Sequence, residues 1–77
     1  MNDKIKCDGL IYVAMMATKS GLPIFQIDEC VISSAHEFDN TGNVGKAILT
    51  GRKMIAMYVA LNKIAKFIDS VAPVQAL

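Results

Sequence analysis

The residues that could perform chemistry are few and lie near the middle of the chain. His36 is the only histidine, and Glu29, Glu37 and Asp39 are acidic residues close to it in the sequence. Glu29, His36 and Asp39 lean toward one side of a helix, but the chain lacks a second histidine and the Glu-x-x-His spacing of carboxylate-bridged metal helices. We therefore expect neither a metal site nor a bound cofactor.

Nucleophilic catalysis would need a thiol or hydroxyl beside His36. Cys30 is six residues away from it, so the two side chains point to different sides of one helix. Ser33 is within helical reach of His36, but no orienting acid and no oxyanion loop accompany the pair. The sequence therefore predicts a protein that is not an enzyme.

A bound anion is a second chemical possibility. Gly42-Asn43-Val44-Gly45, followed by Lys46, precedes a helix and offers backbone N–H groups. The segment lacks the spacing of a Walker A loop, and no strand precedes it. A plain turn with a helix N-cap is the preferred interpretation, and binding of a nucleotide or another small ligand remains open.

These residues are positioned by helices. Periodicity and Gly and Pro punctuation predict three of them, over about residues 3–19, 23–38 and 43–71, with a short tail over 72–77. Ser20-Gly21-Leu22-Pro23 is typical of one helix ending and another beginning. We expect a single all-α domain, in which a long amphipathic C-terminal helix packs against the first two.

The first two expected helices have different apolar patterns. The first is apolar nearly all round, which predicts burial on several sides. Its regular positions are Leu10, Val13, Ala14 and Ala17, and Ile11, Tyr12, Met15 and Met16 fill the other sides. The second carries one core-facing stripe of Ile24, Ile27, Val31, Ala35 and Phe38, opposite a polar face of Gln26, Glu29, Ser33 and Glu37.

The third expected helix divides into two halves at about 100° per residue. The apolar half, which we expect to face the core, holds Leu49, Met54, Met57, Tyr58, Ala60, Leu61, Ile64, Ala65, Phe67, Ile68 and Val71. Gly45 and Gly51 each cost roughly 1 kcal/mol inside a helix, which predicts a kink, fraying or a close neighbour. Pro73 is expected to end the helix.

Two apolar residues, Ile55 and Val59, interrupt the polar half of that helix. Long cationic side chains flank them, which points to a second contact surface, and ordinary surface scatter is an equal alternative. The candidate interface with a partner or a second copy comprises Ile55, Ala56, Met57, Val59 and Ala60. The alternative basic face, which would contact a ligand or nucleic acid, comprises Lys46, Arg52, Lys53, Lys63 and Lys66.

A helix-turn-helix is the most specific nucleic-acid alternative. Ala17, Gly21, Leu22, Ile27 and Cys30 approximate its spacing of small, glycine and apolar residues. The second helix would then present Ile24, Phe25, Asp28 and Glu29 to DNA, and apolar bulk with negative charge opposes phosphate contact. Binding of DNA through that helix is therefore disfavoured, and membrane-surface binding is less favoured than core packing.

Composition indicates a chain that completes its core by association. Of the 77 residues, 53% are hydrophobic, which together with five glycines exceeds the roughly 45–50% of ordinary soluble domains. A chain this short rarely gains more than about 3–5 kcal/mol from its own core. Cys7 and Cys30 are too few for a disulfide scaffold, so we expect two reduced, packed thiols.

Charge and hydropathy limit the location and the partners. The net charge of +1 gives no general attraction to nucleic acid or anionic membranes. Asp3 and Asp8 oppose an export signal, and the apolar runs are too short to span a bilayer. We expect a cytoplasmic, non-enzymatic adaptor, regulator or inhibitor of bacterial or phage type, which binds itself as a homo-oligomer and also another protein.

Overall fold

The computed structural model describes residues 2–75, with side chains through Val71, and it contains three helices. α1 covers Asn2–Lys19, α2 covers Ile24–Thr41 and α3 covers Val44–Gln75, and no strand occurs within this range. The prediction of a small all-α fold with three helices and a long third one is therefore confirmed.

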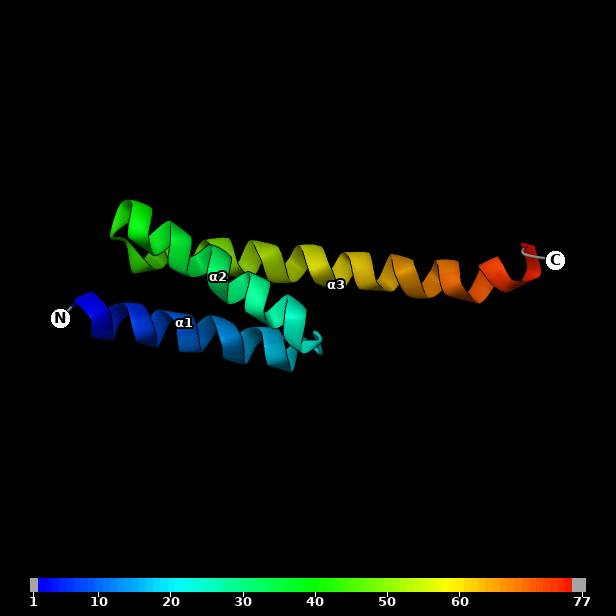
Figure 1. The fold of residues 1–77 in the computed structure, drawn as a ribbon, viewed down its shortest axis with the longest axis horizontal. Coiled ribbons are helices and arrows are strands. Elements are labelled where there is room, and N and C mark those ends of the chain that lie inside the picture. Colours follow the sequence, from blue (N-terminus) through cyan, green and yellow to red (C-terminus); the bar gives the residue numbers. More distant parts are fainter. Residues whose placement is uncertain (1, 76–77) are drawn as a thin grey trace.

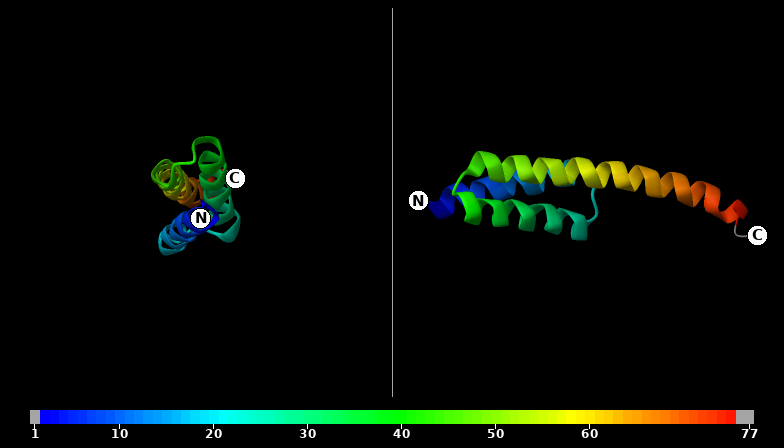
Figure 2. Two further views of the ribbon diagram at one scale, coloured as in Figure 1. Left: turned by 90° about the vertical axis from the view of Figure 1, so that its left-hand side faces the viewer. Right: turned by 90° about the horizontal axis from the view of Figure 1, so that it is seen from above.

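The helices run up, down and up. α1 and α2 form an antiparallel hairpin, and α3 returns alongside both in the direction of α1 (Figure 1, Figure 2). α3 continues well past the ends of the other two, so the molecule measures 58 × 20 × 15 Å. The N-terminal pair is thus an antiparallel helical hairpin joined by a tight turn at Gly21.

Both connections are short and use glycine with a positive φ. Gly21 has φ 79°, and Leu22 then donates a backbone hydrogen bond to the Ala17 carbonyl at 3.3 Å and buries its side chain. Gly42 has φ 65° and donates to the Phe38 carbonyl at 2.7 Å. A residue with a Cβ would be strained at either position, which fixes where α1 and α2 end.

The ends of α2 and α3 lie beyond the expected bounds. The turn expected at residues 39–42 begins only at Gly42, because Asp39, Asn40 and Thr41 form the last turn of α2. α3 continues through Pro73 to Gln75, where a tail was expected from residue 72. Proline fixes φ at a helical value, and its cost, a missing N–H and a clash with the carbonyl four residues earlier, falls here within the last turn of the helix. Residues 76 and 77 lie outside the described part.

The core is small and lies where the three helices meet. Its fully or nearly fully buried apolar members are Val13, Ala17, Leu22, Cys30 and Ile55. Ser34 is also fully buried, and its hydroxyl donates to the Ala47 carbonyl at 2.7 Å, which joins α2 to α3. A buried hydroxyl requires such a partner, because desolvation without one costs about 1–3 kcal/mol.

Close approach of α1 and α3 determines which side of α3 faces inward. A Cβ at Gly51 would lie 2.7 Å from both Val13 methyl carbons, and one at Gly9 would lie 2.6 Å from a Val44 methyl carbon. Of the three outcomes predicted for a glycine within this helix, Gly51 shows the close neighbour. Gly45, by contrast, is exposed and has only the Asn43 side chain near it.

The predicted orientation of α3 is wrong. The inward side carries the small residues Ala47 and Gly51 together with Ile55, whereas most of the predicted apolar half faces outward. Met54 and Tyr58 are the members of that half that pack partly against the core. Small residues allow the helix axes to approach, so packing distance overrides the larger apolar arc.

The first two helices also depart from expectation. α1 buries only Gly9, Val13 and Ala17, and its other apolar sides are open, so burial on several sides is not observed in the single chain. In α2, Gln26 is buried although it was assigned to the polar face, and Ile24 is exposed. Cys7 is exposed, whereas Cys30 is packed as expected.

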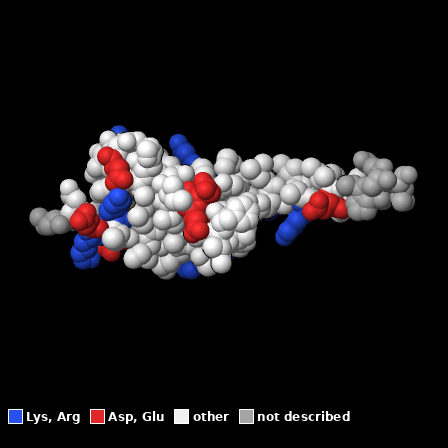
Figure 3. All heavy atoms as spheres, in the orientation of Figure 1, with Lys and Arg blue, Asp and Glu red and all other residues white. Residues whose placement is uncertain are grey.

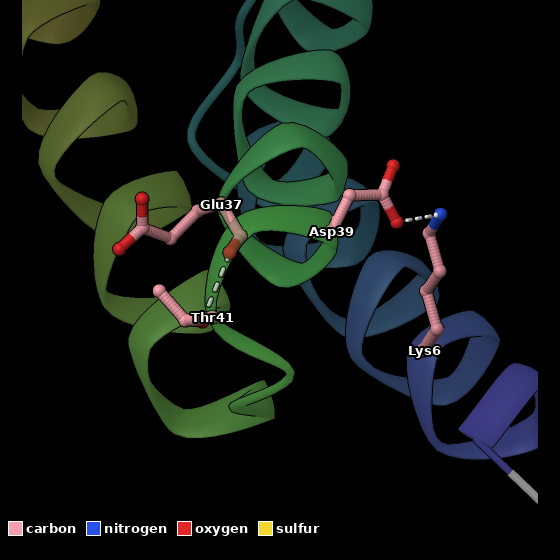
Figure 4. A network of polar contacts seen from close by, with 4 residues as sticks. All are labelled: Lys6, Glu37, Asp39 and Thr41. Atoms are coloured by element: carbon pink, nitrogen blue, oxygen red, sulfur yellow. Dashed lines mark hydrogen bonds and ion pairs between the residues drawn. The ribbon is translucent and has the colours of Figure 1, made fainter.

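A surface ion pair joins the start of α1 to the end of α2. The Lys6 ammonium lies 2.6 Å from a carboxylate oxygen of Asp39 (Figure 4). In the same turn, the Thr41 hydroxyl donates to the Glu37 carbonyl at 2.9 Å. The Asp39 side chain is 60% exposed, so this pair contributes little to stability and mainly aligns the two helix ends.

Candidate interaction surface

The largest group of exposed apolar side chains lies on α3, on the side away from α1 and α2. We call it the outer face of α3, and it consists of Leu49, Met57, Ala60, Leu61, Ile64, Phe67, Ile68 and Val71. Ile64 is 55% exposed and Phe67 is 69% exposed. Exposed apolar surfaces of this kind are unusual on soluble monomers and are candidates for a contact surface.

Five residues of the outer face are spaced like the contact seam of a coiled coil. Met57, Ala60, Ile64, Phe67 and Val71 alternate by three and four residues, which is the a and d pattern of a coiled coil. Leu61 and Ile68 lie one residue further along and broaden the seam on one side. Lys53 interrupts the seam at its N-terminal end, so the uninterrupted part of the seam runs from Met57 to Val71.

The end of the bundle leaves the C-terminal part of α3 alone. The side-chain amides of Gln26 and Asn62 exchange two hydrogen bonds, of 3.1 and 2.7 Å, near the start of α2. Gln26 is only 8% exposed. Beyond Asn62, α3 projects without a neighbouring helix along its side (Figure 1, right-hand half).

On its inward side, the projecting segment carries polar side chains where the part beside the bundle carries apolar ones. On the continuation of the bundle-facing side, Asn62 is followed by Lys66 and Asp69 at helical spacing. These polar side chains need no packing partner. The apolar residues instead continue along the outer face, so the same face of the helix remains unpartnered both beside the bundle and beyond it.

The overall dimensions also show that the chain is less compact than a globular monomer of its length. The accessible surface is 5488 Å², against roughly 4,600 Å² for a compact monomer of this length. The radius of gyration is 15.5 Å, against about 11–12 Å for a compact domain of this size. In the view of Figure 3, charged side chains lie at the N-terminal end, in the middle and on part of the projecting segment, and the visible surface between them is uncharged.

The predicted interface residues divide between core and surface. Ile55 is only 7% exposed and belongs to the core, and Val59 is partly buried against it. Their prediction as a second exposed contact surface is therefore wrong for the single chain, because they lie on the side of α3 that packs on the bundle. Ala56, Met57 and Ala60 are exposed and border or belong to the outer face.

A hollow of about 380 Å³ lies between the end of α1 and α3. Its apolar floor is formed by Met16, Ile55, Ala56 and Val59, and Lys19, Ser20 and Arg52 complete the lining. The volume falls within the range of small-molecule sites, and its lining contains two cations and no acidic residue. The sequence could not reveal it, because Lys19 and Arg52 belong to different helices.

The five basic candidate residues do not share one face. At 100° per residue, Arg52, Lys63 and Lys66 fall within one arc of α3, while Lys46 and Lys53 point well away from it. Only Arg52 contributes to the hollow. The expected basic groove built from all five is therefore not assembled within one chain.

The chemically reactive candidates remain apart. His36 is exposed, and residues 2–75 contain no group of three or more potential metal ligands.

Burial, followed by the charge of Glu29, raises the pKa of the Cys30 thiol, which keeps it protonated and weakly nucleophilic. The Asn43 side chain accepts the Lys46 backbone N–H at 3.1 Å, so Asn43 acts as the N-cap of α3.

No protein-family model matches the sequence, and comparison with curated proteins and with solved structures gives no significant match. Within the described residues, none of the three helices combines the length and the apolar character needed to cross a bilayer.

Proposed function

We propose that this chain is a small, non-enzymatic helical module for protein–protein interaction, which acts as a homo-oligomer through the outer face of α3. The carrying observation is the seam of exposed apolar residues on a helix that extends past its own bundle. A role as adaptor, regulator or inhibitor fits a chain whose largest available surface is apolar. Burial of that surface supplies the driving force.

The exposed area is of the right size for association. The large apolar residues of the outer face present roughly 600 Å² of accessible surface per chain, and each partner in a standard interface contributes about 800 Å². The segment of α3 beyond Asn62 has only about a dozen residues, and an isolated helix of that length is marginal in water, so a partner would stabilise it.

Light scattering coupled to size-exclusion chromatography tests this proposal with a matched pair of variants. Ile64 on the outer face and Ile32 on α2 are 55% and 59% exposed, and neither belongs to the core. We expect the wild type and Ile32→Glu to elute as oligomers and Ile64→Glu to elute as a monomer. Circular dichroism should show that the Ile64→Glu monomer is folded. A wild type that is monomeric at every concentration, or an Ile64→Glu variant that keeps the oligomer mass, contradicts the proposal.

A second candidate function is binding of a small anionic ligand in the hollow between α1 and α3. Arg52 and Lys19 flank an apolar floor there, an arrangement suited to a carboxylate with an aliphatic chain. Calorimetric titration with decanoate tests it. Arg52→Glu is expected to weaken binding at least about fivefold, and Lys53→Glu, outside the hollow, to leave it unchanged. Equal affinities for both variants would exclude this site.

A further inference from the structure

We propose that the occupant of the outer face of α3 is a second copy of α3 in the antiparallel direction, paired at the level of Asn62. This inference rests on the proposed function and specifies its partner and geometry. The seam from Met57 to Val71 is short, apolar and free of acidic residues along its length. A surface with no charge pattern to complement is matched best by another apolar seam of equal length.

The sizes of the seam residues support the antiparallel register. In antiparallel coiled coils, an a residue of one helix packs in a layer with a d residue of the other. Pairing at the level of Asn62 places Met57 opposite Phe67 of the second copy and Ala60 opposite Ile64 of the second copy. Small residues then face large ones, and a thioether faces an aromatic ring, which is a favourable contact.

Charge favours the same direction. Lys46 and Lys53 lie on the outer face or its edge, toward the N-terminal half of α3. A parallel, in-register pair would bring each lysine beside the same lysine of the second copy, where the like charges repel. In the antiparallel pair, the two Lys53 side chains are separated by about 27 Å along the helix axis. Each then lies beside Val71 of the second copy, which its aliphatic stem can cover.

The arrangement leaves room for both bundles. α1 and α2 pack on the side of α3 opposite to the outer face, and the two bundles would therefore lie on the far sides of the paired helices. Each projecting segment would run along the bundle-bearing half of the other copy's α3. The part of α3 that has no neighbour in the single chain thereby gains one.

Distances between spin labels test direction and register together. Cys7 is exposed and is replaced by serine, whereas the fully buried Cys30 is retained. A single cysteine for the label is then introduced as Lys46→Cys or Lys63→Cys, at positions exposed in the bundle. Pulsed electron resonance is measured at a concentration at which light scattering shows the oligomer.

The label at position 46 distinguishes the two directions, and the label at position 63 checks the register of the antiparallel pair. In the antiparallel pair, labels at position 46 lie about 50 Å apart and labels at position 63 about 10–15 Å apart. Short distances at both positions would indicate a parallel pair and overturn this inference, while leaving the proposed function intact. A monomer at all concentrations, including one that sediments with anionic lipid vesicles, would overturn both.

Discussion

The side-chain amides of Gln26 and Asn62 face each other across α2 and α3 and exchange two hydrogen bonds at the level where the bundle ends. Each amide uses one donor and one acceptor in the exchange. Gln26 is buried, so the pair fixes the register of α3 against α2. It thereby also fixes how much of α3 projects beyond the bundle.

A double-mutant cycle measures the strength of this pair. Gln26→Ala and Asn62→Ala are each expected to lower the free energy of unfolding by about 1–2 kcal/mol, because each leaves the other amide without its partner. The double variant should lose less than the sum, with a coupling of about 1 kcal/mol in urea denaturation. Additive losses would show that the two amides do not stabilise each other.

Substitution of Gly51 tests the close approach of α1 and α3. Gly51→Ala would place a methyl group against Val13, and such overpacking costs about 1–3 kcal/mol, more than the roughly 1 kcal/mol that alanine gains in a helix. We expect a lower thermal midpoint.

The matched control is Gly45→Ala, which lies in the same helix but is exposed. Its Cβ approaches only the Asn43 side chain, at 3.2 Å, so the helix propensity of alanine should dominate and raise the free energy of unfolding by up to about 1 kcal/mol. If Gly51→Ala proved as stable as Gly45→Ala, the close packing of Val13 on α3 would be wrong.

The two thiols should differ in reactivity. Cys7 is exposed, whereas Cys30 is buried and burial raises the pKa of its thiol. Alkylation with iodoacetamide at pH 8, followed by mass spectrometry, is expected to modify Cys7 at least about tenfold faster than Cys30. In urea the two rates should converge. Equal rates under native conditions would place Cys30 outside the core.

The sequence predicts the helices well because their limits depend on local chemistry. Gly21 ends α1 with a positive φ, and Leu22 and Pro23 follow as the pattern indicates. The end of α2 at Gly42 was placed a few residues early, since Asp39, Asn40 and Thr41 are turn formers that also fit a last helical turn. Local signals thus give the element and approximate its ends.

The facing of the helices depends on contacts between segments far apart in the sequence. Hydrophobicity alone assigns Phe67 and Ile64 to the core, but Gly51 and Val13 show that close packing selected the side with small residues. The same reasoning missed Gln26, because its burial depends on Asn62, 36 residues away. The sequence therefore shows the outer face as an apolar arc, but it does not show that this arc is exposed in the single chain.

Amide hydrogen exchange as a function of protein concentration tests the central claim, that the outer face of α3 is the contact surface. The segment from Lys63 to Val71 has no neighbouring helix along its side in the single chain, so its amides should exchange rapidly in dilute protein. We predict that protection over residues 57–71 rises with concentration, while residues 10–17 of α1 change little. Protection that is independent of concentration, or that rises instead on the exposed side of α1 around Ile11 and Met15, would contradict the account.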